Sequence, residues 1–234
     1  MRGRLLLPAL LAAVALVATA CGSKTTSSTT STTAPPTTTQ PGTETMPLTI
    51  YKVEHGLLTP TTVQVPQTKA VATSALAALG LPARVGLVGS TAVVSLNHAT
   101  PAQIAEIVFT LTQFPAVHAV DVAGKHDLTR ADYGRFAPLI LVEAPAAHAA
   151  VGPQIQVYGT AEVFEGTLVV ELWQKGKKVD EETVTASAGA PERGLFATDL
   201  DATEVGPGTI VAYSPSAEDG SHQHEVRIPV TVAP

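Results

Sequence analysis

The sequence is poor in cysteine, in aromatic residues and in basic charge. Its single cysteine, Cys21, excludes an internal disulfide and a cysteine-rich zinc site. One Trp, four Tyr and five Phe are too few for an extended stacking platform for bases or sugars. The formal net charge is −6, so we expect no nucleic acid partner, because such proteins carry a basic stripe. Apolar residues make up 45%, which is enough for packed cores.

Residues 1–20 have the pattern of an export signal. A cationic start precedes an apolar run over 5–17, which is shorter than the roughly 20 residues of a membrane-spanning helix. Small residues then lead into Cys21, and this resembles the lipobox of bacterial lipoproteins, with Ala18 where that family usually has Leu. The resemblance implies cleavage between Ala20 and Cys21 and diacylation of Cys21. The alternative is an ordinary secretory signal with an incidental cysteine.

Residues 21–45 are predicted to be the lipidated cysteine and a disordered linker. Almost all of them are Ser, Thr, Pro and Gly, which bury no apolar surface. A flexible coil of this length spans roughly 25–30 Å on average. We therefore expect an extracytoplasmic protein, with the outer face of the cell membrane as the partner of its lipid anchor.

The first folded block is predicted over residues 46–132. Alternation of apolar and polar residues indicates a strand at 48–53, and an apolar stripe indicates a helix at 68–79. Gly89-Ser90 predicts a hairpin turn. Thr100, Pro101 and Gln103 form the start signal of a second helix. With a last strand after it, the order is βαββαβ, a small α+β sheet with two helices on one face.

The end of this block resembles the GerMN domain, which occurs in sporulation and spore germination proteins. The resemblance rests on the run 107–115, on Val117 and on residues 120–124, together with the hairpin before them. The loop over 80–84 is shorter than in that family. The resemblance implies a non-catalytic domain of the bacterial envelope.

The second block, residues 138–234, is predicted to be all β. Turn residues punctuate candidate strands at 139–144, 154–163, 167–174, 178–186, 194–200, 208–213 and 224–232. In the last of them Pro229 fits an edge position or a bulge. Short strands at this spacing are typical of an immunoglobulin-like β-sandwich.

Part of this block resembles the immunoglobulin-like domain of bacterial spore germination. The resemblance rests on residues 157–165, with Gly194, Phe196 and residues 213–220 downstream. That domain commonly follows a GerMN domain in lipoproteins of Gram-positive envelopes. Neither family supplies a catalytic residue or a cofactor, and we expect no enzyme, no catalytic residue and no cofactor here.

Three residues are candidates for a contact surface. Trp173 is out of phase with the apolar residues of its strand, so it is predicted on the outer face of the sandwich, either as a contact patch or packed against the first domain or under a loop. Tyr133 and Arg135 lie between the blocks and, with the Trp173 face, would line a polar cleft.

Two further patterns have simple structural explanations. His222 and His224, with Asp219 or Glu225, are a conceivable metal site, but no third ligand has a characteristic spacing, so a solvated loop is predicted and no metal. Phe164 is predicted to lie in the core.

The sequence leaves two binding hypotheses open. The first is a tethered module that assembles an envelope protein partner or self-associates. The second is a lipoprotein that captures a cell-wall component or a small solute. A third, an envelope hydrolase, lacks a recognisable nucleophile or metal set.

Overall fold

The computed structural model describes residues 44–234. The residues from Gly42 to Pro234 form one compact unit. The predicted signal, Cys21 and most of the linker therefore lie outside the described residues. Within the described part, no helix has both the length and the hydropathy needed to cross a membrane.

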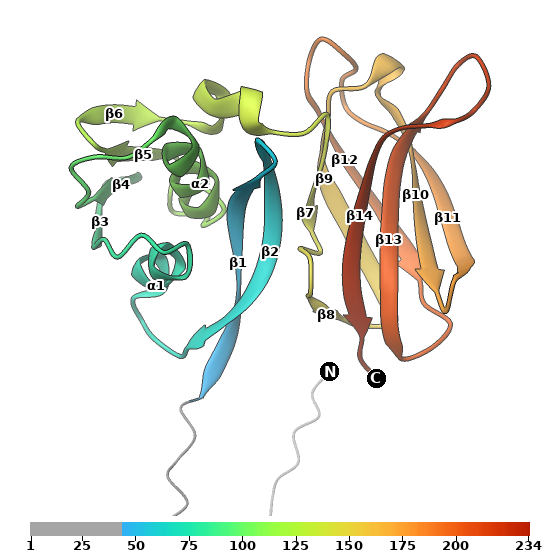
Figure 1. The fold of residues 1–234 in the computed structure, drawn as a ribbon, viewed down its shortest axis with the longest axis horizontal. Helices are drawn as coiled ribbons and strands as arrows, with labels where there is room; N and C mark the ends of the chain where they lie inside the picture. Colours follow the sequence, from blue (N-terminus) through green and yellow to red (C-terminus); the bar gives the residue numbers. More distant parts are fainter. Residues whose placement is uncertain (1–43) are drawn as a thin grey trace, which may run out of the picture. The chain divides into compact units, whose positions relative to one another are not determined.

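The first half, an α/β half, extends to the 3-10 helix η1. Its elements are β1 (Thr45–Glu54), β2 (Leu57–Pro66), α1 (Val71–Ala78), β3 (Val85–Val88), β4 (Thr91–Val94), α2 (Pro101–Leu111), β5 (Ala119–Val122), β6 (Lys125–Leu128) and η1 (Arg130–Phe136). The two helices lie between the sheet of β3 to β6 and the hairpin of β1 and β2 (Figure 1). Each helix therefore packs on the sheet with one side and on the hairpin with the other.

The strand order of this half differs from the predicted βαββαβ order. The strand predicted at 48–53 forms a separate antiparallel hairpin with β2, a strand that the sequence analysis missed. The turn is His55-Gly56, with positive φ at both residues, a less common sequence for such a turn than Asn-Gly. The main sheet has the order β3-β4-β5-β6, so it gains β6, a second unpredicted strand.

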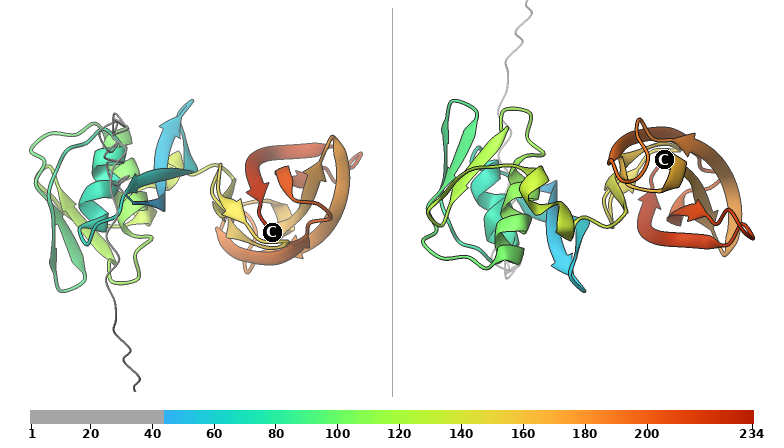
Figure 2. Two further views of the ribbon diagram at one scale, coloured as in Figure 1. Left: turned by 90° about the horizontal axis from the view of Figure 1, so that it is seen from below. Right: turned by 90° about the horizontal axis from the view of Figure 1, so that it is seen from above.

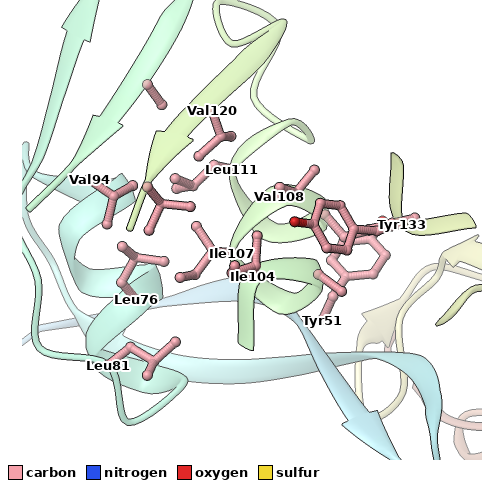
Figure 3. Packing of buried hydrophobic residues seen from close by; sticks show 14 of the residues in the cluster. Tyr51, Leu76, Leu81, Val94, Ile104, Ile107, Val108, Leu111, Val120 and Tyr133 are labelled. Carbon is pink, nitrogen blue, oxygen red and sulfur yellow. The ribbon is translucent and has the colours of Figure 1, made fainter. Parts of the chain in front are cut away.

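The signals that start α2 act as predicted. The Thr100 hydroxyl accepts from the Gln103 backbone N–H, and the Gln103 side chain accepts from the Thr100 N–H. Pro101 occupies the first turn, where its missing N–H costs nothing. Ile104, Ile107 and residues beyond them are fully buried in the core of this half (Figure 3).

The second half is a β-sandwich. Its elements are β7 (Ile140–Ala144), β8 (Ala150–Val151), β9 (Gln154–Ala161), η2 (Phe164–Gly166), β10 (Thr167–Gln174), β11 (Lys177–Thr185), β12 (Gly194–Asp201), β13 (Gly206–Pro215) and β14 (His222–Val232). One sheet has the order β11-β10-β13-β14-β8 and the other β12-β9-β7. Seen end-on, the two sheets face each other (Figure 2). All seven predicted strands are present.

Alternating side chains of both sheets fill the sandwich core. Leu168, Val170 and Leu172 of β10 are fully buried there, and Ile155 and Val157 come from the facing sheet. The first two strands of this half belong to different sheets: β7 pairs with β9, and β8 pairs in parallel with β14. The segment between β7 and β8 therefore lies at the edge of the sandwich.

Candidate functional site

The contact between the two halves contains a partly buried polar network. Glu143 of β7 accepts hydrogen bonds at Oε2 from the Tyr51 hydroxyl at 2.9 Å and from Arg130 Nη1 at 2.6 Å. The β7–β9 register shifts between Val142 and Ala144, so Glu143 is the extra residue of a bulge. A bulge re-aims a side chain, here toward the first half.

Hydrogen bonds and two aromatic rings surround the Arg130 guanidinium. Its Nε donates to Thr112 Oγ1 at 2.8 Å and its Nη2 to the Phe109 carbonyl at 3.2 Å. The guanidinium carbon lies 5.3 Å from the ring centroid of Tyr51 and 4.9 Å from that of Phe109. Burial raises the pKa of Tyr51, and the Glu143 charge raises it further. The Tyr51 hydroxyl is therefore a permanent donor in this network.

A cleft of about 1070 Å³ opens above this network; we call it the junction cleft. Polar side chains of the first half line one side, namely Thr49, Thr62, Gln64, Thr112, Gln113 and His118. The other side is lined by residues 144–146 and 148–150 and by Tyr158 and Leu195. Tyr158 is 52% exposed and Leu195 69%. The cleft therefore combines hydrogen-bonding groups with accessible apolar surface, as ligand-binding clefts do.

The structure does not bring the three predicted contact residues together. Tyr133 and Arg135 lie on η1, where the Tyr133 ring stacks on Phe136 and the Arg135 guanidinium lies 4.9 Å from the centroid of the Phe136 ring. Tyr133 is buried in the core of the first half. Trp173 belongs to a separate cluster on the sandwich. None of these three residues lines the junction cleft.

Trp173 lies on the outer face of the sandwich, as its phase predicts. It is partly buried and packs against Val169, Val211 and Tyr213. Its indole N–H donates to Glu171 Oε2 at 2.6 Å. Glu171 Oε1 also accepts from Lys178 at 3.2 Å and from the Tyr213 hydroxyl at 3.3 Å. These partners belong to β10 and β13 of its own sheet, and not to the first half or to a loop.

Glu171 makes stability depend on pH. Its side chain is 3% exposed; burial raises its pKa, but the hydrogen bonds from Trp173, Lys178 and Tyr213 outweigh burial and leave the pKa below its usual range. A carboxyl group whose pKa is lowered by folding stabilises the fold at pH values above its ordinary pKa. This contribution is lost as the pH falls through the lowered pKa. We expect Glu171→Gln to reduce the loss of stability between pH 7 and about pH 3. Urea unfolding at both pH values tests this, with Glu182→Gln on the neighbouring strand as an exposed control.

His222 and His224 lie at the start of strand β14 and not in the predicted solvated loop. His222 stacks on Tyr213 with ring centroids 3.4 Å apart and pairs with Glu225 at 2.7 Å. His224 is exposed with a φ of +56°, which interrupts the alternation of the strand. Among residues 44–234, no group of three potential ligands has the geometry of a metal site.

The core position predicted for Phe164 is wrong. Its side chain is 71% exposed, and Val163 occupies the buried position instead. The cause is the turn that follows, in which Glu165 and Gly166 both have positive φ. This turn directs the Phe164 side chain outward.

The sequence analysis missed the polar network of Arg130, Glu143 and Tyr51. A signal for it existed, because Glu143 interrupts the otherwise apolar run Leu139-Ile-Leu-Val-Glu-Ala. A charge inside a buried strand requires a partner. Nothing in the sequence identified Arg130 as that partner, since the contact joins segments of different halves.

The comparisons with known proteins concern mainly the second half. Residues 139–221 match the model of the immunoglobulin-like domain of bacterial spore germination, which confirms that prediction. The comparison with curated proteins found no match. Among solved structures, the crystal structure of an engineered protein is 17% identical, with a TM-score of 0.32. The match covers 58% of this chain and 38% of the engineered one, so the chain spans well under half of that protein's length.

Proposed function

We propose that the chain is a membrane-anchored envelope lipoprotein that binds and assembles a partner protein and catalyses no reaction. The observation that carries the proposal is the match of residues 139–221 to the immunoglobulin-like domain of bacterial spore germination, which links the chain to spore germination-related proteins. Immunoglobulin-like sandwiches present edges and loops on a rigid scaffold, a design suited to binding.

The proposed anchor is a diacylated Cys21. It follows an apolar run and small residues, in the order of a lipobox. Each buried CH₂ of an acyl chain contributes about 0.8 kcal/mol, and two chains give stable attachment. The linker of Ser, Thr and Pro would then hold the folded halves away from the lipid.

The first half is proposed to be a GerMN-like domain. Three features support this: the hairpin of β3 and β4, the capped helix α2 and strand β5 coincide with the segments that resemble that family. A GerMN domain followed by the immunoglobulin-like domain is the order that the sequence resemblance implies. The process served would be assembly at the outer face of the cell membrane.

The junction cleft favours a second candidate function, the capture of a cell-wall fragment or a small solute. Its lining combines amide, hydroxyl and imidazole groups, which suit a polar ligand. Titration with purified muropeptides, followed by the fluorescence of Tyr and Trp or by calorimetry, separates this function from protein binding.

Cross-linking in intact cells tests the leading proposal. The full chain with an affinity tag is cross-linked at the membrane and purified, beside a Cys21→Ser variant. We expect the wild-type protein in the membrane fraction with one reproducible protein partner, and the variant in the soluble fraction without it. An unchanged membrane fraction for Cys21→Ser would contradict the anchor, and capture of no reproducible partner would contradict the binding role.

A further inference from the structure

The wall of the junction cleft that belongs to the first half is polar. The cross-strand pair Thr49 and Thr62 lines the cleft, and Gln64 lies beside it on β2. Ile50 and Val65, which alternate with these residues, are buried in the cluster that includes Ala75 of α1. The hairpin of β1 and β2 therefore presents hydroxyl and amide groups to the cleft, and each of them can donate and accept a hydrogen bond.

The wall that belongs to the second half is apolar. Tyr158 of β9 pairs with Ala197 and Leu195 of β12 pairs with Thr160, so Tyr158 and Leu195 are diagonal neighbours on one face of their sheet. Their side chains are 52% and 69% exposed. The rest of this wall includes five small or cyclic apolar residues, Ala144, Pro145, Ala146, Ala149 and Ala150. Single exposed apolar side chains are ordinary on protein surfaces, but two neighbouring ones in a concave site are typical of a contact surface.

The charges in the lining of the junction cleft are paired with each other. Among the described residues, the lining contains one guanidinium, Arg130, and one carboxylate, Glu143, and these form the ion pair of the network. The lining also contains the imidazoles of His118 and His148. Asp199 lies outside it, in a small groove beyond Tyr158. Apart from the imidazoles, the cleft has no excess charge of either sign, so it suits an uncharged ligand.

The size of the junction cleft favours a chain segment over a small solute. Its volume of about 1070 Å³ is above the roughly 300–1,000 Å³ that is typical of small-molecule pockets. The hairpin face from Pro47 to Tyr51 extends over about 14 Å at about 3.4 Å per residue, which is the length of a short extended peptide. Side chains of an extended peptide alternate between two sides, as the two walls of the cleft require.

We propose that the junction cleft binds an extended, uncharged segment of the partner protein. The inference rests on the proposed binding function and names the site and the kind of segment bound. Every second side chain of the segment is apolar and packs on Tyr158 and Leu195. The backbone and the intervening polar side chains bond to the hydroxyl and amide groups of Thr49, Thr62 and Gln64. A tyrosine suits this role, because it offers a large contact area with few rotatable bonds.

Panning of a random peptide display library on the purified full chain in detergent tests the proposal. We expect enriched peptides that are uncharged and carry apolar residues at alternate positions. The decisive variant is Leu195→Asp, which places a charge on the apolar wall. Val205→Asp is the matched control, because Val205 is 60% exposed in the same half and lies outside the cleft. By fluorescence anisotropy, we expect at least about a tenfold loss of peptide affinity for Leu195→Asp and less than about a threefold change for Val205→Asp.

A second pair of variants tests the polar wall. Thr62→Val removes one hydroxyl, and it keeps the side-chain shape and the backbone N–H that donates to the Ala147 carbonyl. Thr183→Val changes an exposed threonine of β11 outside the cleft. We expect about a three- to tenfold loss of peptide affinity for Thr62→Val and none for Thr183→Val.

The proposal is overturned if no peptide is enriched, or if either Leu195→Asp or Thr62→Val binds the enriched peptides as the wild type does. Displacement of the peptides by purified muropeptides would also overturn it and would assign the junction cleft to the second candidate function. Cross-linking at the membrane separates this inference from the proposed function. A partner that Leu195→Asp still captures would exclude the cleft as its site while leaving the binding function intact, whereas capture of no partner by the wild type would contradict the function itself.

Discussion

Replacing Glu143 by Gln is expected to lower the free energy of unfolding by about 2–3 kcal/mol, because it leaves the Arg130 charge without its carboxylate. The side chains of Arg130 and Glu143 are 28% and 15% exposed, so water replaces the lost partner only in part. The network joins the two halves, and we expect their unfolding to become less cooperative. Urea unfolding followed by circular dichroism measures both effects.

The Arg193–Glu162 pair provides the control for this variant. Its atoms are 3.2 Å apart and its side chains are 23% and 35% exposed, within the sandwich. We expect Glu162→Gln to cost less than about 1 kcal/mol, because the contact is longer and the Glu162 carboxylate is more exposed than that of Glu143. Equal losses for the two variants would mean that the network contributes no special coupling between the halves.

Gly159→Ala is expected to have the largest effect of a single methyl group, a loss of about 4 kcal/mol or of the folded state. A Cβ on Gly159 would lie 2.0 Å from the Leu141 carbonyl oxygen and 3.0 Å from the Val142 Cα. Both are backbone atoms of β7, which cannot move without breaking the pairing with β9. Thermal unfolding of the purified variant measures the loss.

Gly86→Ala is the matched control, since no atom lies within 4 Å of its added Cβ. Gly86 is also a strand residue, paired with Val93 in the first half. We expect a change within about 0.5 kcal/mol. A Gly159→Ala protein as stable as the control would show that β7 does not approach β9 so closely. The bulge that directs Glu143 toward Arg130 would then be in doubt.

Local signals predicted the sandwich and α2 well. Each depends on residues close in sequence: alternation along the strands and the capping residues of α2. The strand β2 was missed because its residues contain Pro60 and few alternating apolar positions. It is a strand because β1 and the Ala147 segment bond to its two edges, which are contacts of high sequence separation.

The candidate sites were harder to predict than the fold. The phase of Trp173 gave its face correctly, but its packing against Val211 and Tyr213 depends on β13, a distant strand. The junction cleft depends on the bulge at Glu143, and no turn residue marks a bulge inside a strand. Surfaces built from two halves require the tertiary structure.

Site-specific photo-cross-linking in native membranes tests the central claim, the binding of a partner protein, most directly. A photoreactive amino acid replaces Leu195, which is 69% exposed at the junction cleft, and Leu87 in a control. The account predicts a discrete adduct with one envelope protein from position 195, and none from position 87. No adduct from position 195, or the same adducts from both positions, would contradict it.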